Sequence, residues 1–226
     1  MREHTAALNP PRALWVPFML GRPFGVPNDA AFQRKVLLAA LQLLEREAGP
    51  VLEDFPEDAP HEKLTAPPAG LACPVSFPRM KSEGTLAEKL ADEVSQLEAW
   101  HAVAVKLHGR TTLGVTGLSP NAIAAYLAHW LNGETPAPFR ADITHGDALK
   151  QACDELKAYY YEAKAVQPGS HSGKSIQDWF WLETAAGLSI VQLRALAATS
   201  TNASVKAVSG MSLIPRTVET LLKAAG

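Results

Sequence analysis

The sequence lacks the features that mark several specialised classes of protein. No apolar run reaches the roughly 18 residues that a membrane-spanning helix needs, so we expect no membrane partner. Its 21 lysine and arginine residues are balanced by 23 acidic residues, and a pI of about 6.4 argues against a dedicated nucleic-acid-binding protein. The first 15 residues hold no long apolar core with a small-residue cleavage site, which predicts no signal peptide and a cytoplasmic location.

Cysteine is also scarce. Cys73 and Cys153 are far apart, at no spacing typical of a metal site, so we expect two reduced thiols rather than a disulfide. Cys153 shares an apolar stripe with Leu149 and Leu156, which predicts a small buried hydrophobic residue. Cys73 lies in a proline-rich stretch and should be the more accessible thiol. The hydrophobic fraction, 47%, is ordinary for a globular protein and excludes wholesale disorder.

Proline is abundant at one end of the chain and rare at the other. Twelve of the 17 prolines precede residue 79. Proline is excluded from helix interiors because it lacks a backbone donor and clashes with the preceding turn. We therefore expect residues 1–84 to form a proline-rich arm, one helix and a long loop. Residues 85–226 have room for long helices and should form one compact helical bundle.

The single helix of the proline-rich part is predicted over residues 28–48. Asn28 is a suitable N-cap, and apolar residues recur at helical spacing from Phe32 to Leu44. Gly49-Pro50 ends the pattern. Residues 49–84 carry seven prolines with little periodicity, so irregular backbone is predicted there.

Capping signals predict where the bundle helices begin. Thr85-Leu-Ala-Glu88 and Thr144-His-Gly-Asp147 have the spacing of capping boxes, and Ser119-Pro120 places an N-cap before a proline at the first helical position. Arg110–Val115 is the one candidate strand. We therefore predict an all-α fold, a bundle whose helices start at Thr85, Ser119, Thr144 and Ser175 and end near Gly109, Gly133, Gln167 and Ala198, with a short helix after Pro215.

His101 stands out because it continues an apolar helix face that begins at Leu90. Glu98 lies three residues before it, and a Glu-x-x-His pair on one helix face is an arrangement with which di-iron proteins bind metal. Glu155, Glu162 and Glu183, on other predicted helices, could supply further oxygen ligands. Glu98, His101 and Glu162 are therefore candidate ligands for a divalent metal or iron. The alternative for His101 is a hydrogen-bonded core residue.

Glu183 is a candidate catalytic acid or base together with His101. It lies in the segment WFWLETAAG, and burial among large apolar groups would raise the pKa of its carboxyl. A structural salt bridge to Arg110 or Arg194 is the alternative. Arg110, at a helix end, and Tyr160, in an aromatic-rich stretch, are candidate cofactor-binding residues. A loop arginine that caps helix carbonyls and a tyrosine packed in the core are the corresponding alternatives.

The segment Leu20–Glu45, LGRPFGVPNDAAFQRKVLLAALQLLE, resembles part of the B-component family of the glycine, betaine, sarcosine and D-proline reductases. Proteins of that family carry a similar proline-rich turn before an acidic, leucine-rich helix. The resemblance implies reductase-like chemistry, which in that family rests on a redox-active selenocysteine or cysteine shortly before this turn. Residues 7–20 of this chain contain no cysteine, so the resemblance identifies no catalytic residue here.

Two functions are compatible with these residues. The first is a reductase-like or metal-assisted enzyme with a site between the bundle helices. The second is a non-enzymatic interaction or scaffold protein that docks through the arm and the helix Phe32–Leu44. Trp15, Phe18 and Phe24 favour docking, because a proline-rich arm should not bury these side chains within itself. The surface that covers them would belong either to the bundle or to a second copy of the chain. In the second case the protein would be a homo-oligomer.

Overall fold

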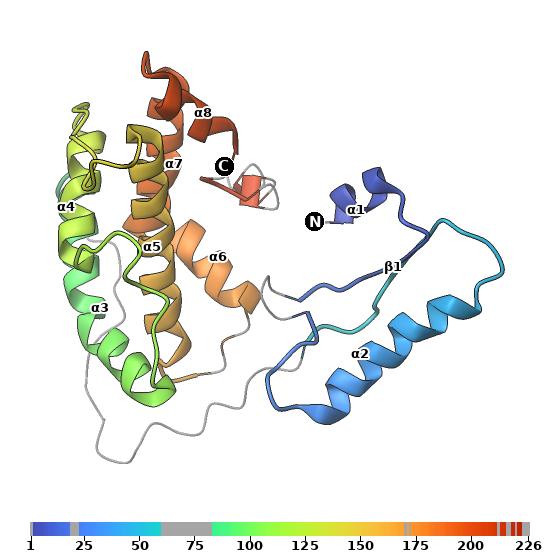
Figure 1. The fold of residues 1–226 in the computed structure, drawn as a ribbon. Helices are drawn as coiled ribbons and strands as arrows, with labels where there is room; N and C mark the ends of the chain where they lie inside the picture. The colour runs from blue at the N-terminus through green and yellow to red at the C-terminus, as the bar shows by residue number, and fades with distance from the viewer. Residues whose placement is uncertain are drawn as a thin grey trace. The chain divides into compact units, whose positions relative to one another are not determined.

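The structure is a computed structural model that describes residues 2–18, 23–59, 83–169, 171, 173–211, 213–215, 218–219 and 221–222. Contacts divide the chain into two compact units, residues 1–64 and 65–226. The predicted mainly helical fold is confirmed (Figure 1). None of the helices in the described ranges has the length and apolar character needed to cross a membrane. The predicted boundary between residues 84 and 85 stays a prediction, and Cys73 lies outside the described residues.

The N-terminal unit contains a parallel strand pair that the sequence did not predict. β1 (Arg12–Trp15) pairs with β2 (Val51–Asp54), so that Arg12 lies opposite Val51 and Trp15 opposite Asp54. Parallel strands need a crossover connection, and α2 (Ala30–Gln42) lies within it. Backbone hydrogen bonds between β1 and β2 therefore connect the arm to the first part of the predicted loop.

Asp29 caps α2, whereas Asn28 was the predicted cap. A carboxylate oxygen of Asp29 accepts from the backbone amide of Phe32 at 3.0 Å. Asn28 has a φ of 64°, a left-handed conformation that belongs to the preceding turn. The helix is also shorter than predicted, since it ends at Gln42 and continues as a single 3-10 turn, η1 (Leu43–Glu45).

Phe32, Val36 and Phe55 form the buried core of the N-terminal unit, and Phe18 packs against it. Phe18 packs on Phe32 and Phe55 with ring centroids 5.5 and 5.8 Å apart, and Phe32 meets Phe55 edge-on at 6.0 Å. Such tilted and edge-to-face contacts are the favoured arrangements of aromatic rings. Phe18 of the arm is therefore covered by α2 and by the residue that follows β2, rather than by the bundle or a second copy of the chain. A short helix, α1 (Arg2–Leu8), precedes β1.

The second unit is the predicted helical bundle. The predicted caps at Thr85, Ser119 and Thr144 are confirmed, and in each case the side-chain oxygen accepts from a backbone amide of the first turn. α3 packs against α4, α5 and α7, and α5 also packs against α4, α6 and α8 (Figure 1). The helices are α3 (Leu86–His108), α4 (Pro120–Leu131), α5 (His145–Ala165), α6 (Gly173–Glu183), α7 (Ala185–Ala198) and α8 (Ala203–Met211).

The helix predicted from Ser175 to Ala198 is in fact two helices. Thr184 ends α6 and caps α7, because its hydroxyl donates to the carbonyl of Phe180 and accepts from the amide of Gly187. A Cβ atom added at Gly187 would lie 2.1 Å from the Phe180 carbonyl oxygen. The sequence placed Gly187 inside one long helix, whereas its lack of a side chain is what permits this tight junction.

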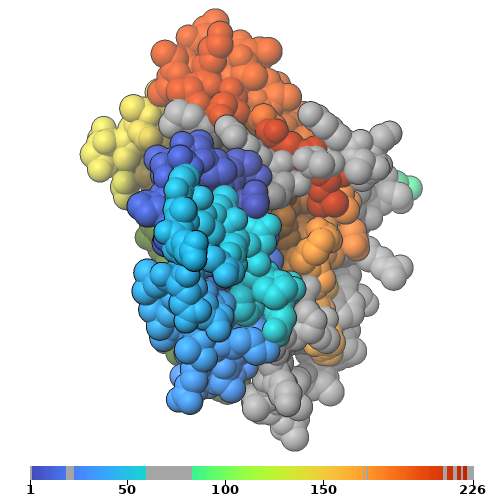
Figure 2. All heavy atoms as spheres, turned by 90° about the vertical axis from the view of Figure 1, so that its right-hand side faces the viewer, coloured from blue at the N-terminus to red at the C-terminus, as the bar shows by residue number. Residues whose placement is uncertain are grey.

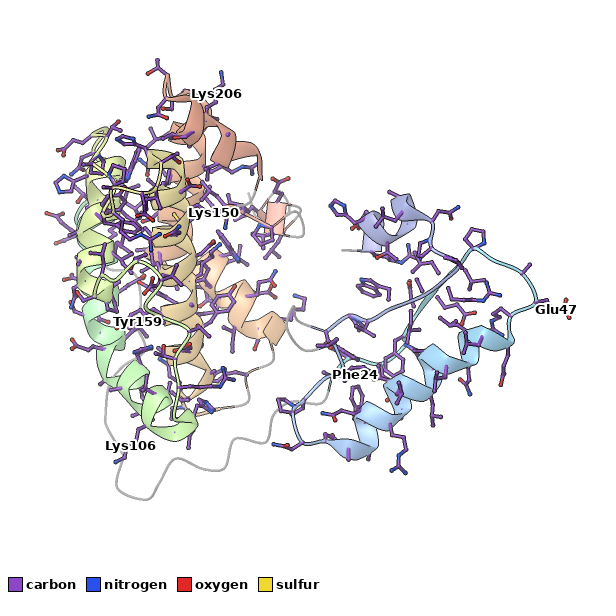
Figure 3. The ribbon with its side chains drawn as sticks, in the orientation of Figure 1. Phe24, Glu47, Lys106, Lys150, Tyr159 and Lys206 are labelled. Atoms are coloured by element: carbon purple, nitrogen blue, oxygen red, sulfur yellow. The ribbon has the colours of Figure 1, made fainter. Side chains whose placement is uncertain are left out.

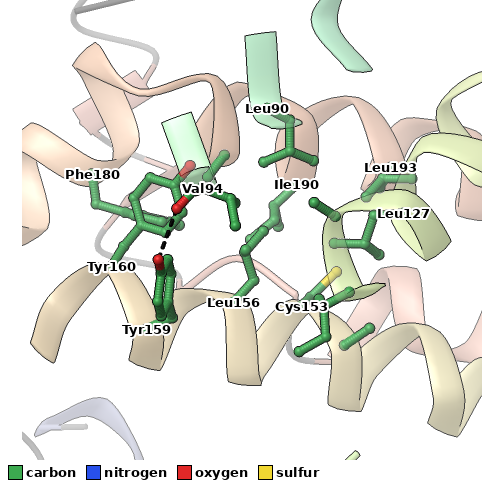
Figure 4. Close-up of a cluster of buried hydrophobic side chains, with 14 of the residues drawn as sticks. Leu90, Val94, Leu127, Cys153, Leu156, Tyr159, Tyr160, Phe180, Ile190 and Leu193 are labelled. Atoms are coloured by element: carbon green, nitrogen blue, oxygen red, sulfur yellow. Dashed lines mark hydrogen bonds between the residues drawn. The ribbon is translucent and has the colours of Figure 1, made fainter. Parts of the chain in front are cut away.

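The bundle core consists of aliphatic and aromatic side chains from α3, α4, α5, α6 and α7, several of which Figure 4 shows. The Tyr159 hydroxyl donates to the carbonyl of Val94 at 2.7 Å, which joins α5 to α3. Cys153 is a free thiol with no exposed surface, as predicted. Burial raises the pKa of this thiol to about 12, so at neutral pH it is an unreactive hydrophobic residue.

Candidate functional site

Two of the predicted site residues meet at the surface of the bundle. His101 on α3 and Glu162 on α5 approach each other, with 3.0 Å between Nε2 and a carboxylate oxygen. Their side chains are 15% and 21% exposed, so the pair is partly shielded from water. The imidazole ring also packs on the ring of Tyr159, with centroids 4.9 Å apart. The structure therefore offers an oriented histidine–carboxylate pair.

Glu162 is further bound by the loop that follows α3. The hydroxyl of Thr111 donates to one carboxylate oxygen at 2.7 Å, and the hydroxyl and amide of Thr112 donate to the other, each at 2.7 Å. Burial alone would raise the pKa of Glu162, but the hydrogen bonds from Thr112, Thr111 and His101 outweigh it and the pKa is lowered. Glu162 is therefore held as a carboxylate.

Glu155 holds the same loop two turns earlier on α5. One of its oxygens accepts from the amide of Gly114 at 2.6 Å and the other from the amide of Thr116 at 2.7 Å. These bonds explain why Arg110–Val115, the predicted strand, is an irregular loop. Three of the amides between residues 112 and 116 donate to carboxylates of a helix rather than to a neighbouring strand.

Glu93 is a buried carboxylate that the sequence analysis missed. It receives the amides of Ala185, at 2.8 Å, and Ala186, at 3.3 Å, and the hydroxyl of Tyr160 at 3.0 Å. The two amides form the N-terminus of α7, where a negative charge is favoured by the helix dipole. Burial raises the pKa of Glu93 even so. The signal in the sequence was an acid on the apolar face of Leu90 and Val94.

The other predicted site residues lie apart from the His101–Glu162 pair or serve the core. Glu98, Glu183 and Arg110 are exposed, which corrects the expectation that Glu183 is buried among apolar groups. Arg194, one of the two partners considered for Glu183, binds Glu219 at 2.6 Å instead. Tyr160 is fully buried against Glu93. Among the described residues, no three His, Cys, Asp or Glu side chains are grouped closely enough to hold a metal ion.

A hollow of about 270 Å³ lies where the C-terminal ends of α4 and α7 meet, and its walls include Trp130 and Ser200. The residues that line it do not include His101 or Glu162. The histidine–carboxylate pair is therefore not placed in this hollow. An enclosed substrate site of the kind typical of small-molecule enzymes would need such a concavity around the reactive groups.

The outer face of α2 is the other unusual surface. Leu37, Leu38, Leu41 and Leu44 are 47%, 52%, 51% and 71% exposed, while the opposite face of the helix buries Phe32 and other apolar residues. Positions 37, 41 and 44 form a stripe along one side of a helix. Figure 2 shows the light-blue atoms of α2 on the surface of the N-terminal unit. We call these four leucines the α2 leucine face.

Charged residues flank the α2 leucine face. Arg34 precedes it, and Glu45 and Glu47 follow it; all are exposed. Figure 3 labels Glu47 just beyond the C-terminal end of α2.

Comparison of the chain with family models, curated proteins and solved structures finds no match. The resemblance of Leu20–Glu45 to the reductase B components therefore stays a prediction.

Proposed function

We propose that this chain is a non-enzymatic interaction protein that docks on a partner protein through the α2 leucine face. The observation that carries the proposal is the set of four leucines, each about half exposed or more, on α2 and the η1 turn that continues it. Exposed apolar groups that are contiguous mark binding surfaces, because removing them from water is worth about 25 cal/mol per Å². A partner would therefore gain by covering them.

Three shielded glutamates of the bundle support this proposal because their carboxylates already have partners within the chain. Both oxygens of Glu93, Glu155 and Glu162 accept hydrogen bonds from backbone amides or side chains of the bundle. Carboxylates bound in this way stabilise helix ends and a loop. The bundle then serves as a scaffold and the N-terminal unit carries the contact surface.

Site-specific crosslinking tests the proposal. A photoreactive amino acid at Leu41 should form adducts with a partner protein in the producing cells, and the adducts can be identified by mass spectrometry. The same amino acid at Leu8, which is 81% exposed on α1 of the same unit, is the matched control. Equal adducts at both positions, or none at either, would show that the α2 leucine face is not a docking surface.

The contact between His101 and Glu162 favours a second candidate function, a reductase-like or metal-assisted enzyme. A carboxylate that orients an imidazole is a common element of acid–base and metal sites. The measurement is the metal content of the chain purified without added metal, for the unaltered protein and for His101→Ala. Bound metal that is lost in His101→Ala would support this function. A metal-free protein that His101→Ala merely destabilises would make the pair structural.

A further inference from the structure

The charges at the two ends of the α2 leucine face are opposite in sign and have no ion-pair partner within the described part of the chain. The neighbouring charges, Lys35 and Arg46, form ion pairs within the unit. Lys35 binds Glu57 at 2.8 Å and Arg46 binds Glu53 at 2.6 Å. Arg34, Glu45 and Glu47 are left, and Glu47 lies beyond the end of η1. Arg34 and Glu45 are the two that lie on α2 and η1. They lie 11 residues apart on the helix and its final turn, a distance of about 16 Å along the axis, so they cannot pair with each other.

We infer that the partner of the α2 leucine face is a second copy of this chain, docked with the two α2 helices antiparallel. This inference rests on the proposed function. Arg34 lies four residues before Leu38, and Glu45 lies four residues after Leu41. Consider an antiparallel pair with two-fold symmetry in which Leu38 of one copy lies opposite Leu41 of the other. Arg34 of each copy then lies opposite Glu45 of the other, so the same charge pair forms at both ends of the contact. This register buries Leu38 and Leu41 of both copies and pairs Arg34 with Glu45 at each end of the contact.

A parallel arrangement of the same helices is disfavoured. It would set Arg34 against Arg34 and Glu45 against Glu45, and like charges directly opposite each other repel. It would also align the two helix dipoles, whereas an antiparallel pair opposes them. A two-fold axis across the helices makes the contact isologous, which is the commonest symmetry of soluble dimers.

The size of the face predicts a weak dimer. α2 and η1 together span 16 residues, which gives a strip about 24 Å long and about 10 Å wide. Stable interfaces bury about 800 Å² on each partner, and this strip is smaller. We therefore expect dimerisation that depends on concentration in the micromolar range or above, rather than a permanent dimer.

Sedimentation velocity over a concentration series of the full chain tests the leucine contacts. The unaltered chain should pass from monomer to dimer, and the double variant Leu37→Glu/Leu41→Glu should stay monomeric. Leu8→Glu, which changes an exposed leucine outside the face, should dimerise like the unaltered chain. All three positions are exposed, so the variants should fold, and circular dichroism checks that they do.

Charge reversal tests the register. Arg34→Glu and Glu45→Arg should each weaken self-association by roughly tenfold, because two attractive pairs become repulsive. A mixture of the two variants should recover the dimer, since each Glu at 34 would then meet an Arg at 45. A parallel arrangement predicts little weakening of either single variant, because like charges already face each other in it. Weakening without recovery would overturn the antiparallel arrangement.

Two outcomes separate this inference from the proposed function. If the chain is monomeric at every concentration but Leu41 crosslinks to a different protein, the self-association is overturned and the docking function stands. If the chain is monomeric, Leu41 gives no adduct, and Leu37→Glu/Leu41→Glu lowers the melting temperature, the face is covered by the rest of its own chain. That result would overturn both.

Discussion

The glutamates that face the interior of the bundle all bind backbone amides. A carboxylate can accept several hydrogen bonds, and it is costly to bury unless it does so. Glu93 binds the start of α7, whereas Glu155 and Glu162 bind the loop between α3 and α4. Each carboxylate accepts from backbone amides that have no acceptor within a helix or strand. Replacing one of these glutamates should therefore mainly lower the stability of the fold.

Replacing Glu93 should be strongly destabilising. Glu93→Ala would leave two buried amides and the Tyr160 hydroxyl without an acceptor. Each such loss costs about 1–3 kcal/mol, so we expect the free energy of unfolding to fall by at least about 2 kcal/mol in urea denaturation. Glu98→Ala, on the exposed side of the same helix, should change it by less than about 0.5 kcal/mol. Similar effects for both would show that Glu93 does not hold α7.

Glu162 should make stability depend on pH in a defined direction. Its pKa is lowered in the fold, so the unfolded chain takes up a proton first, near its ordinary value of about 4.3. The stabilisation is therefore present at neutral pH and is lost as pH falls through the lowered pKa. Glu162→Gln should be less stable than the unaltered chain at pH 7, and the difference should shrink toward about pH 3.

The control for this pH series is Glu98→Gln, which alters an exposed carboxyl. Its unfolding free energy should follow that of the unaltered chain across the whole range. A stability difference for Glu162→Gln that stayed constant, or grew on acidification, would mean that the bonds from Thr111, Thr112 and His101 do not hold Glu162 as a carboxylate.

At the scale of secondary-structure elements, the junction between α6 and α7 has the clearest requirement for one residue type. Gly187→Ala would place a Cβ atom 2.1 Å from a backbone carbonyl oxygen, so the junction would have to open. We expect a loss of about 2 kcal/mol or more and a lower melting temperature. The matched control is Gly210→Ala in α8, where no atom lies within 4 Å of the added Cβ. That change should be neutral or stabilise by up to about 1 kcal/mol.

Helix starts could be predicted from the sequence because the signal is local. Thr85, Ser119 and Thr144 each bind an amide a few residues away, so neighbouring residues suffice to identify them. The strands could not be predicted in this way. β1 and β2 have four residues each and are separated in sequence by the whole of α2. Their pairing depends on the tertiary fold. The high proline content of residues 1–84 favoured irregular backbone in the prediction, so the strands were not expected.

The candidate site was predictable only in part for the same reason. His101 and Glu162 were found because each departs from the pattern of an apolar helix face, and the structure brings them together. Glu93 and Glu155 carry the same signal, but their partners are amides of a junction and a loop whose paths the sequence does not specify. Glu183 was expected to be buried because its neighbours are large, yet it lies on the outer side of α6.

At the scale of the whole molecule, stability and association rest on different residues. The bundle glutamates have their partners inside the second unit, whereas the α2 leucine face and the flanking Arg34 and Glu45 are exposed on the first. Substitutions at Glu93 or Gly187 should therefore lower the melting temperature without changing the dimer dissociation constant. Substitutions at Leu37 or Leu41 should do the reverse.

Salt separates the two contributions to the proposed dimer. Raising the salt concentration from about 0.05 M to about 0.5 M shortens the range over which exposed charges act to a few ångströms, but leaves the burial of leucines largely unaffected. We therefore expect the dissociation constant of the unaltered chain, measured by sedimentation velocity, to rise only a few-fold. The defects of Arg34→Glu and Glu45→Arg should become smaller at high salt, because their repulsion is screened. Leu37→Glu/Leu41→Glu should stay monomeric at both salt concentrations, and a return to dimer at high salt would show that charge, rather than the leucine face, drives association.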